Sequence, residues 1–390
     1  MKIKQWETKQ LDDVATFSSG GTPSKEEENY WEGDYPWISA KDMKSFSIKD
    51  AGLKLTPEGL AVAKIAKKGS ILVLVRGMTL LKDLPVGYVE RDVAFNQDIK
   101  ALVAKSGVSG LFLAYALIAN KNRILNLVNV AGHGTGRLDT TLLKEFPIDL
   151  PPLLEQCSIA EVLGIWDESI DLLERLIGKV RSRKQGLMQQ LLTGKKRFKE
   201  FEGSEWKEYC LGDLFDERKE TCYEHLPLLS ITREKGIIFR DEVERKDNSN
   251  SDKSKYLHIC PGDIGYNTMR MWQGVSALSA FEGIVSPAYT ILIPRKEVNG
   301  SFFGFLFKYY PIVSTFERYS QGLTSDTWTL KIDSFSKIRV NIPSLPEQEK
   351  IAAVLSAADE EISTLEKQLA AYKQQKLGLM QQLLTGRIRI

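Results

Sequence analysis

Two stretches of the chain carry hydrophobic residues at alternating steps of four and three, the pattern of a coiled-coil helix. In the first stretch, in which Lys184 is the only break, these positions are Ile159, Leu163, Trp166, Ile170, Leu173, Ile177, Val180, Leu187 and Leu191. The second keeps the same phase at Ile351, Leu355, Ala358, Ile362, Leu365, Leu369, Tyr372, Lys376, Leu379 and Leu383, with a lysine at one position. The pattern predicts two long helices, each of about 38 residues and roughly 57 Å.

The two helical stretches are also copies of each other. The segment Gly186-Leu-Met-Gln-Gln-Leu-Leu-Thr-Gly194 recurs letter for letter as Gly378-Leu-Met-Gln-Gln-Leu-Leu-Thr-Gly386. Upstream, Pro151-Pro-Leu-Leu-Glu-Gln156 is matched by Pro343-Ser-Leu-Pro-Glu-Gln348 at the same offset of 192 residues. Prolines before each helix and glycines after it are typical start and stop signals. The repeat predicts a domain at 1–150, a long helix within 151–198, a second domain at 199–342 and a second long helix within 343–390.

A hydrophobic seam of this length requires a partner seam, and the other copy is the obvious one. We expect antiparallel pairing within one chain, because a two-fold axis across the helices makes both seams self-complementary. This symmetry places Leu173 near Leu365, and Ile159 near the 379–383 end of the second helix. The alternative, a dimer between two chains through each seam, remains open.

The two domains share a frame rather than a sequence. Trp6 and Trp206 stand at matching places, and each domain ends in a polar loop, a short apolar segment and the prolines. In the first domain, Thr56-Pro57 predicts a helix start, and residues 71–75 and 93–103 read as strands. Helices and strands do not alternate regularly, so we predict mixed α/β (α+β) domains. Near-identical helices indicate that both helices bind the same kind of partner. Divergent domains indicate that each domain binds a different target.

Composition excludes several classes of protein. The apolar runs 71–75 and 111–118 are too short to cross a membrane, and the amino terminus lacks the apolar core of a signal peptide, so we expect a cytoplasmic protein. A net charge of +2 indicates that any basic surface is local. The four cysteines show no CxxC pairing, which favours reduced thiols and no metal site.

Two segments look like catalytic or phosphate-binding motifs, and both are weak. Asp149-Leu-Pro-Pro152 departs from the loop of amino-methyltransferases by an inserted leucine and a missing aromatic residue. The glycine-rich loop 132–136 lacks a Walker lysine and the full dinucleotide pattern, although its amides are suited to a DNA phosphate. We therefore expect no catalytic residue and no cofactor on this chain.

The duplicated proline entry with Glu-Gln, the heptad helix and the Leu-Met-Gln-Gln-Leu-Leu-Thr-Gly ending together resemble the specificity subunit of type I restriction–modification systems. Phe17-Ser-Ser-Gly-Gly-Thr-Pro-Ser-Lys25 and the aromatic segment 30–38 are similar to a target-recognition domain of that family. The resemblance implies that each domain reads half of a split DNA site. It also implies that the helices set the gap and carry two modification subunits, which bind S-adenosylmethionine and methylate adenine. A restriction (motor-nuclease) subunit then joins the complex.

On that resemblance, side chains with bidentate or planar donors in loops are candidates for DNA contact. They are Arg76, Asn96, Gln97, Arg137, Arg270, Gln273, Arg318 and Gln321, with Trp272 beside them. Lys25, Lys41, Lys253 and Lys255 suit phosphates, and His133 lies in the glycine-rich loop. We expect ten apolar residues to serve inter-helix packing and subunit docking: Ile159, Leu163, Ile170, Leu173, Ile177, Ile351, Leu355, Ile362, Leu365 and Leu369.

Each candidate taken alone is also consistent with a solvated surface residue. A structural adaptor without nucleic-acid binding explains the helices but not two divergent domains. A fused methyltransferase is a third hypothesis, which the missing motifs oppose.

Overall fold

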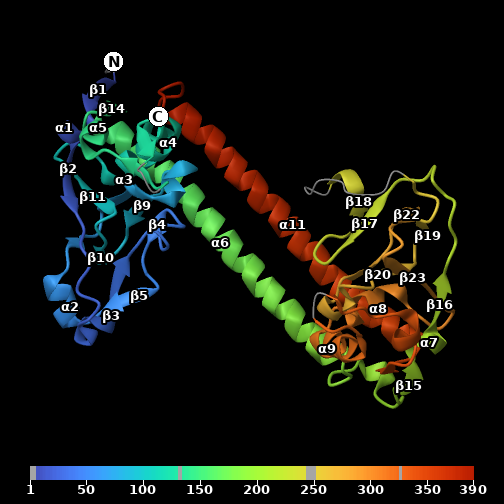
Figure 1. Ribbon diagram of the computed structural model, residues 1–390. Coiled ribbons are helices and arrows are strands. Elements are labelled where there is room, and N and C mark those ends of the chain that lie inside the picture. Colours follow the sequence, from blue (N-terminus) through green and yellow to red (C-terminus); the bar gives the residue numbers. More distant parts are fainter. Residues whose placement is uncertain (1–5, 131–133, 243–251, 325–326) are drawn as a thin grey trace. The chain divides into compact units, whose positions relative to one another are not determined.

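The computed structural model describes residues 6–130, 134–242, 252–324 and 327–390. The chain forms two compact units, one of Met1–Glu174 with Gln368–Ile390 and one of Arg175–Lys367. Two helices of 39 residues each, α6 (Leu153–Leu191) and α11 (Leu345–Leu383), contribute a part to both units (Figure 1). No helix in the described part of the chain is both long and apolar enough to cross a membrane.

The first unit contains the N-terminal domain, whose main sheet has the order β2-β11-β7-β9-β4. These strands are β2 (Ala15–Ser19), β11 (Ile99–Ala104), β7 (Ile71–Leu74), β9 (Val86–Val89) and β4 (Ser47–Ile48). A second sheet has the order β5-β3-β10-β6, with strands β5 (Leu53–Leu55), β3 (Trp31–Ile38), β10 (Val93–Phe95) and β6 (Ile65–Ala66). Helix α3 (Gly110–Ala119) packs its buried side chains into the same core as β7.

Two smaller sheets complete the N-terminal domain. One joins β12 (Val128–Val130), β13 (Gly136–Leu138) and β8 (Arg76–Gly77). The other pairs β1 (Glu7–Gln10) with β14 (Pro147–Leu150). The remaining helices are α1 (Leu11–Val14), α2 (Pro57–Val62), α4 (Lys121–Leu125), α5 (Thr140–Lys144) and the 3-10 turns η1 (Glu28–Tyr30) and η2 (Met78–Leu81).

The second unit contains the C-terminal domain, built on the sheet β16-β23-β20-β21. Its strands are β16 (Phe215–Arg218), β23 (Tyr289–Pro294), β20 (Ile264–Asn267) and β21 (Ser276–Leu278). Three strand pairs surround it: β17 (Leu229–Thr232) with β18 (Gly236–Phe239), β19 (Leu257–Ile259) with β22 (Gly283–Val285), and β15 (Lys207–Cys210) with β24 (Arg339–Ile342). Its helices are α7 (Leu211–Leu214), α8 (Gly300–Leu306), α9 (Tyr310–Tyr319), α10 (Ile332–Phe335) and the turns η3 (Lys199–Phe201), η4 (Arg240–Glu242) and η5 (Met271–Gln273).

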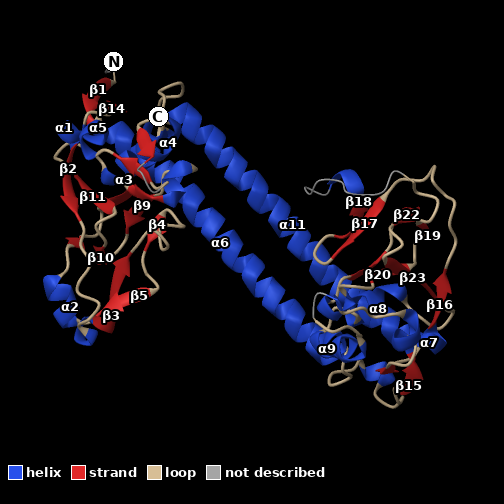
Figure 2. Ribbon diagram, in the orientation of Figure 1, coloured by secondary structure: helices blue, strands red, loops and turns tan. Residues whose placement is uncertain are grey.

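Both domains use one frame, as the weak likeness of their sequences predicted. In each, a central buried strand (β7 or β20) pairs with the strand that precedes the capped helix α3 or α8. The cap residues correspond: Ser109 accepts a hydrogen bond from the amide of Phe112, and Asn299 accepts one from Phe302. Figure 2 shows the resulting mixture of strands and helices in each domain. The mixed α/β class and the internal repeat are confirmed.

Local sequence signals in the N-terminal domain agree with the structure at one point and differ at another. Thr56 caps α2 as predicted, by accepting a hydrogen bond from the amide of Gly59 at 3.1 Å. The stretch 93–103 is not continuous but divides into β10 and β11, in different sheets. The division falls at Asn96, whose side-chain oxygen accepts a hydrogen bond from the amide of Asp98 and so forms a turn.

The two long helices run antiparallel, which the contacts inside each unit show separately. In the first unit, Lys376 lies 2.5 Å from Asp167, and Lys373 lies 2.7 Å from Glu174. In the second unit, Lys184 lies 2.5 Å from Asp359 and Arg181 pairs with Glu366. The ten predicted seam residues are all buried or half-buried. Their burial is consistent with helix packing, and the register of Leu173 opposite Leu365 remains a prediction.

The ends of the helices pack into the domain cores. Ile159 and Leu163, near the start of α6, share the core of the first unit with Met380 and Leu383, near the end of α11. In the second unit, Ile351 and Leu355 share a core with Leu191 and Leu192. Gly194 and Gly386 end the helices in the left-handed region, at φ +67° and +69°.

A buried carboxylate at the start of each helix binds an arginine that follows the end of the other helix. Glu347, with 1% of its side chain exposed, accepts from Arg197 Nε at 2.9 Å and Nη2 at 2.5 Å. Glu155 in the same way accepts from Arg389, with Nη2 to Oε2 at 2.6 Å. These contacts raise the pKa of both guanidinium groups. The sequence showed the repeated glutamate but not its partner.

The neighbouring glutamine joins each long helix to its own domain. Gln156 Oε1 accepts from the amide of Ser109 at 2.8 Å, and its Nε2 donates to the carbonyl of Pro151 at 2.8 Å. Gln348 repeats both contacts with Asn299 and Pro343 at 2.9 and 3.0 Å. In the repeated motif, the Glu therefore joins the start of its helix to the segment that follows the other helix, and the Gln joins it to its own domain.

We predict that Glu347→Ala lowers the free energy of unfolding by about 3–5 kcal/mol, because Arg197 is then left mostly buried without its counter-charge. Urea unfolding followed by circular dichroism measures the change. Glu200→Ala is the control, since Glu200 pairs with Lys350 at the surface and such pairs contribute less than about 1 kcal/mol. Equal effects of the two substitutions would contradict the structural importance of the buried pair.

Candidate functional site

In the N-terminal domain the candidates Arg76, Asn96, Gln97 and Arg137 gather where the central strand ends. Strand β8 follows β7 directly and pairs with β13 so that Arg76 lies opposite Arg137. The amides of Val75 and Arg76 both donate to the carbonyl of Asp98, at 2.8 and 3.3 Å. This contact ties the 96–98 turn to the base of β8. Four residues distant in the sequence therefore share one edge of the domain.

The two arginines form a pair of like charges. Both side chains are exposed, and directly opposed residues of antiparallel strands point to the same face. Among the described residues, no carboxylate oxygen lies within 4.0 Å of either guanidinium group. Opposed like charges are destabilising, and an anion between them removes the repulsion while accepting charge-assisted hydrogen bonds. The arrangement is suited to a phosphate or to the acceptor edge of a base.

Glycines permit the close packing behind this arginine pair. A Cβ on Gly136 would lie 2.9 Å from the Cβ of Leu80 and 3.1 Å from the carbonyl oxygen of Gly77. Gly20, in the motif that led to the family resemblance, has no room for a Cβ against the carbonyls of Phe95 and Asn96. The neighbouring Thr22 donates to Gln97 Oε1 at 2.7 Å. The glycine motif thus supports the turn that carries Gln97.

The C-terminal domain presents its candidates at the corresponding place. Turn η5 follows the central strand β20, with Arg270 just before it and Trp272 and Gln273 within it. The loop after α9 lies against this turn, because Leu330 donates its amide to the carbonyl of Thr268 at 2.8 Å. Gln321 is held in that loop by a bridge to Thr329. Arg270, Gln273 and Gln321 therefore belong to one surface region.

The side chains of Trp272 and Arg318 also contact neighbouring residues of the domain. The indole of Trp272 packs edge-on against Trp328 at 5.3 Å, and its Nε1 donates to the carbonyl of Met269 at 3.1 Å. The tryptophan therefore supports the turn. Arg318 donates to Thr315 one turn earlier in α9, at 3.0 Å, and remains exposed.

The structure does not place the remaining candidates with these groups. Lys25 lies beside Trp31 and Lys54 at a hollow on the edge of β3 and β5. Lys41 is exposed in the turn that follows β3. In the second domain, Lys253 packs on the ring of Tyr256, and Lys255 is exposed. His133 lies outside the described residues.

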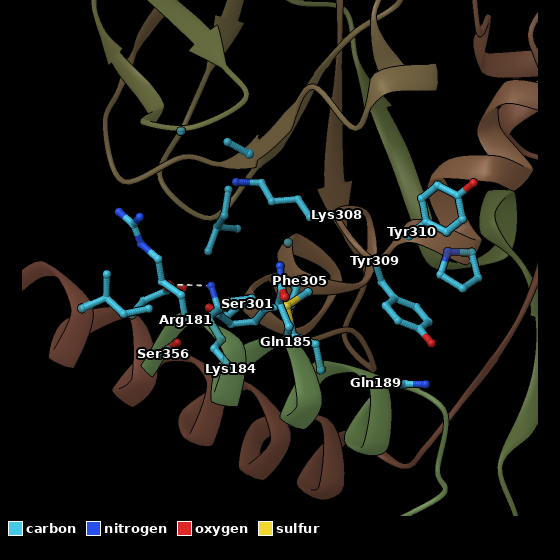
Figure 3. Close-up of a pocket in the computed structure, with 18 residues that line it drawn as sticks. Arg181, Lys184, Gln185, Gln189, Ser301, Phe305, Lys308, Tyr309, Tyr310 and Ser356 are labelled. Carbon is cyan, nitrogen blue, oxygen red and sulfur yellow. Dashed lines mark hydrogen bonds and ion pairs between the residues drawn. The ribbon is translucent and has the colours of Figure 1, made fainter. Parts of the chain in front are cut away.

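A basic pocket in the second unit was not predicted from the sequence. Figure 3 shows Arg181, Lys184 and Gln185 of α6 on one side and Lys308, which follows α8, on the other. Burial and the nearby Lys184 lower the pKa of Lys308. The pocket suits an acidic or apolar side chain of a protein partner. Only the packing of α8 and α9 against the long helices creates it, so no local signal in the sequence indicates it.

Comparison with protein families gives a match over most of the chain. Residues 3–182 and 203–372 each match the family described as type I restriction modification DNA specificity domain.

Relatives of this chain are named as specificity subunits. The EcoR124I/EcoR124II specificity subunit of Escherichia coli is 30% identical over 166 residues, which are 42% of this chain and 41% of that protein. The MjaIX specificity subunit of Methanocaldococcus jannaschii is 31% identical over 176 residues, 43% of this chain and 39% of that protein. The chain thus matches about two fifths of the length of these two relatives. The MjaVIII specificity subunit of the same archaeon is 23% identical over 413 residues, 99% of this chain and 94% of that protein.

Solved structures agree in fold. The type I restriction–modification S subunit from M. genitalium superposes with a TM-score of 0.63 at 18% identity, covering 98% of this chain and 96% of that one. A chain from a study of complex assembly and conformational transition of the type I R-M system gives 0.57 at 16% identity, covering 98% and 99%.

Proposed function

Because the chain belongs to the type I restriction modification DNA specificity family, we propose that each domain reads one half of a bipartite, asymmetric site in double-stranded DNA. The chain acts as the non-catalytic specificity subunit of a type I restriction–modification complex in the cytoplasm. S-adenosylmethionine and methyl transfer belong to two modification subunits, and a restriction (motor-nuclease) subunit completes the complex.

The observation that carries this proposal is the recurrence of one kind of surface at one place in both domains. The segment after the central strand presents Arg76 opposite Arg137 in the first domain, and Arg270 with Gln273 in the second. Arginine and glutamine provide the paired donors and acceptors that read base edges in the major groove. Because the side chains differ between the domains while the frame is shared, the two half-sites differ in sequence.

The long helices support docking of two equal partners. The repeated ending places Gln189 and Gln190 of α6, and Gln381 and Gln382 of α11, at exposed positions. Packing of the helices within the chain does not require the same residues at these exposed positions of both helices. Docking of two copies of one partner does require them. Since the ten seam residues are buried or half-buried, we assign them to helix packing and the docking to outer faces. The helices also set the unspecified gap between the half-sites.

We predict that Arg76→Ala and Arg137→Ala each weaken binding of the assembled complex to its target. Loss of a base contact costs about 1–3 kcal/mol and relaxes one position of one half-site, and loss of a phosphate contact lowers the slope of affinity against salt by about 1. Fluorescence anisotropy at several salt concentrations measures both. Lys68→Ala is the matched control, because this exposed lysine precedes the other end of the same strand β7. Loss of affinity in the control alone would argue against this face.

We predict that exchange of residues 1–150 for the matching domain of a relative changes one half of the recognised sequence and leaves the other. Sequencing of methylated sites in cells that carry the complete system measures the outcome. A change in both halves would show that the domains do not read independently.

We predict that one extra heptad in both long helices widens the gap. Seven residues lengthen each helix by about 10.5 Å, which corresponds to roughly three base pairs at 3.4 Å each. Rotation of one half-site by about 100° weakens binding in the same variant, given about 10.5 base pairs per turn. For the unmodified chain we predict a gap of about six base pairs, since half-sites about one helical turn apart share a face of the DNA. An unchanged gap with active methylation would exclude the helices as the spacer.

A further inference from the structure

A cluster of potential metal ligands lies in the C-terminal domain. His258 and Cys260 are two residues apart on and just after β19, so their side chains emerge on the same side of the strand. Glu282 directly precedes the partner strand β22. The ligand atoms of the three residues all lie within 4.8 Å of one another. The absence of paired cysteines predicted no metal site, whereas this cluster combines a His-x-Cys spacing with a glutamate from another part of the chain.

The distance from His258 Nε2 to the sulfur is that between two ligands of one tetrahedral ion, and the distance from Nε2 to Glu282 is shorter. His258 Nε2 lies 3.0 Å from Glu282 Oε1 and 3.6 Å from Cys260 Sγ. Around a zinc ion, with bonds of about 2.0–2.1 Å to N or O and 2.3 Å to S, ligand atoms are roughly 3.3–3.6 Å apart. The three ligand atoms therefore lie around one small volume.

This volume is surrounded by acceptors. His258 Nδ1 lies 3.0 Å from Glu220 Oε2, so carboxylates face both ring nitrogens. A neutral imidazole has one N–H and can satisfy only one of them. An imidazolium donates to both carboxylates, whereas a neutral imidazole with its proton on Nδ1 leaves Nε2, the carboxylate of Glu282 and the sulfur as three neighbouring acceptors that a bound cation would satisfy.

Residues behind the cluster hold its side chains in place. Arg218 Nη1 binds Glu220 Oε1 at 2.8 Å, and its Nε binds Asp263 Oδ2 at 2.8 Å. Asp263 Oδ2 also accepts from the amide of Cys260 at 2.8 Å. A carboxylate on the second ring nitrogen is the usual orienting partner of a metal-bound histidine. Glu220 therefore acts as a positioning residue.

The environment combines a buried ligand with access from solvent. The side chain of His258 is 7% exposed, and the ring of Tyr223 stacks on it at 4.0 Å. The side chain of Glu282 is 56% exposed, which leaves an approach for an ion.

The N-terminal domain shows what occupies the equivalent place when no metal is needed. Strands β6 and β10 correspond to β19 and β22 in pairing and order. There, Lys67 takes the place of Cys260 and Asp92 that of Glu282, and the two form an ion pair of 2.7 Å. In the first domain the ammonium group of Lys67 is the cation at this place. In the second domain a thiol and a histidine lie there instead.

We propose that His258 Nε2, Cys260 Sγ and the Glu282 carboxylate bind one zinc ion, with water as the fourth ligand. The nitrogen, sulfur and oxygen set is one that zinc prefers. The ion joins β19, β22 and, through Glu220, the segment after β16, so its role is to stabilise the C-terminal domain.

The test uses the full chain without a histidine tag, stripped with a chelator and titrated with Zn²⁺ by calorimetry or with Co²⁺ by absorption. We expect one ion per chain and the absorption bands of a cobalt–thiolate bond. Cys260→Ser removes these bands and weakens zinc binding at least tenfold, and Glu282→Gln at an exposed position weakens it without unfolding. Glu220→Gln keeps the bands and lowers affinity about 10–100-fold. Cys210→Ser, a half-buried cysteine outside the cluster, is the control.

Two results would overturn the proposal. One is the absence of stoichiometric zinc binding and of cobalt–thiolate bands in the unmodified chain. The other is binding that persists unchanged in Cys260→Ser and Glu282→Gln, which would place the ion elsewhere. A rise in the thermal unfolding midpoint with Zn²⁺ in the unmodified chain, absent in Cys260→Ser, supports the stabilising role without relying on folding of the His258 variant.

Discussion

The buried pairing of a glutamate at the start of one long helix with an arginine beyond the end of the other is the contact on which the architecture depends. An ionised carboxylate with almost no exposed surface requires a counter-charge, and the chain supplies it only from the antiparallel partner. Parallel helices would bring the two glutamate ends together and leave both carboxylates buried without one. Direction is therefore specified by electrostatics, and the apolar seam contributes stability without distinguishing one orientation from the other.

The glutamine next to each glutamate adds a second constraint, which joins the helix to its own domain. Its amide group satisfies an amide and a carbonyl of its own domain, so rotation of the helix about its axis would leave buried polar groups unpaired. One dipeptide thus fixes both the partner and the orientation of the helix. Because the device occurs twice, each unit is assembled in the same manner, although its recognition surface differs.

The sequence allowed the prediction of features that depend on residues close together along the chain. It did not allow the prediction of contacts between residues far apart along the chain. Heptad spacing and the letter-for-letter repeat are local, so the presence of both long helices could be predicted from them. The opposition of Arg76 and Arg137 depends on the register of β8 and β13, which no periodicity reveals. The break at Asn96 and the partners of Glu155 and Glu347 depend likewise on tertiary contacts. Trp272 was named only as a neighbour of the candidates for DNA contact, and its packing on Trp328, which supports the turn, likewise depends on a residue distant in the sequence.

The division of the chain between the units also determines the order in which they can fold during synthesis. The second unit is one continuous stretch, Arg175–Lys367, and all of its core contacts become available once that stretch has left the ribosome. The first unit requires Gln368–Ile390, whose Met380, Leu383 and Arg389 contact residues made more than two hundred positions earlier. Contacts of such high sequence separation form slowly. The N-terminal domain, although translated first, therefore acquires its complete core last.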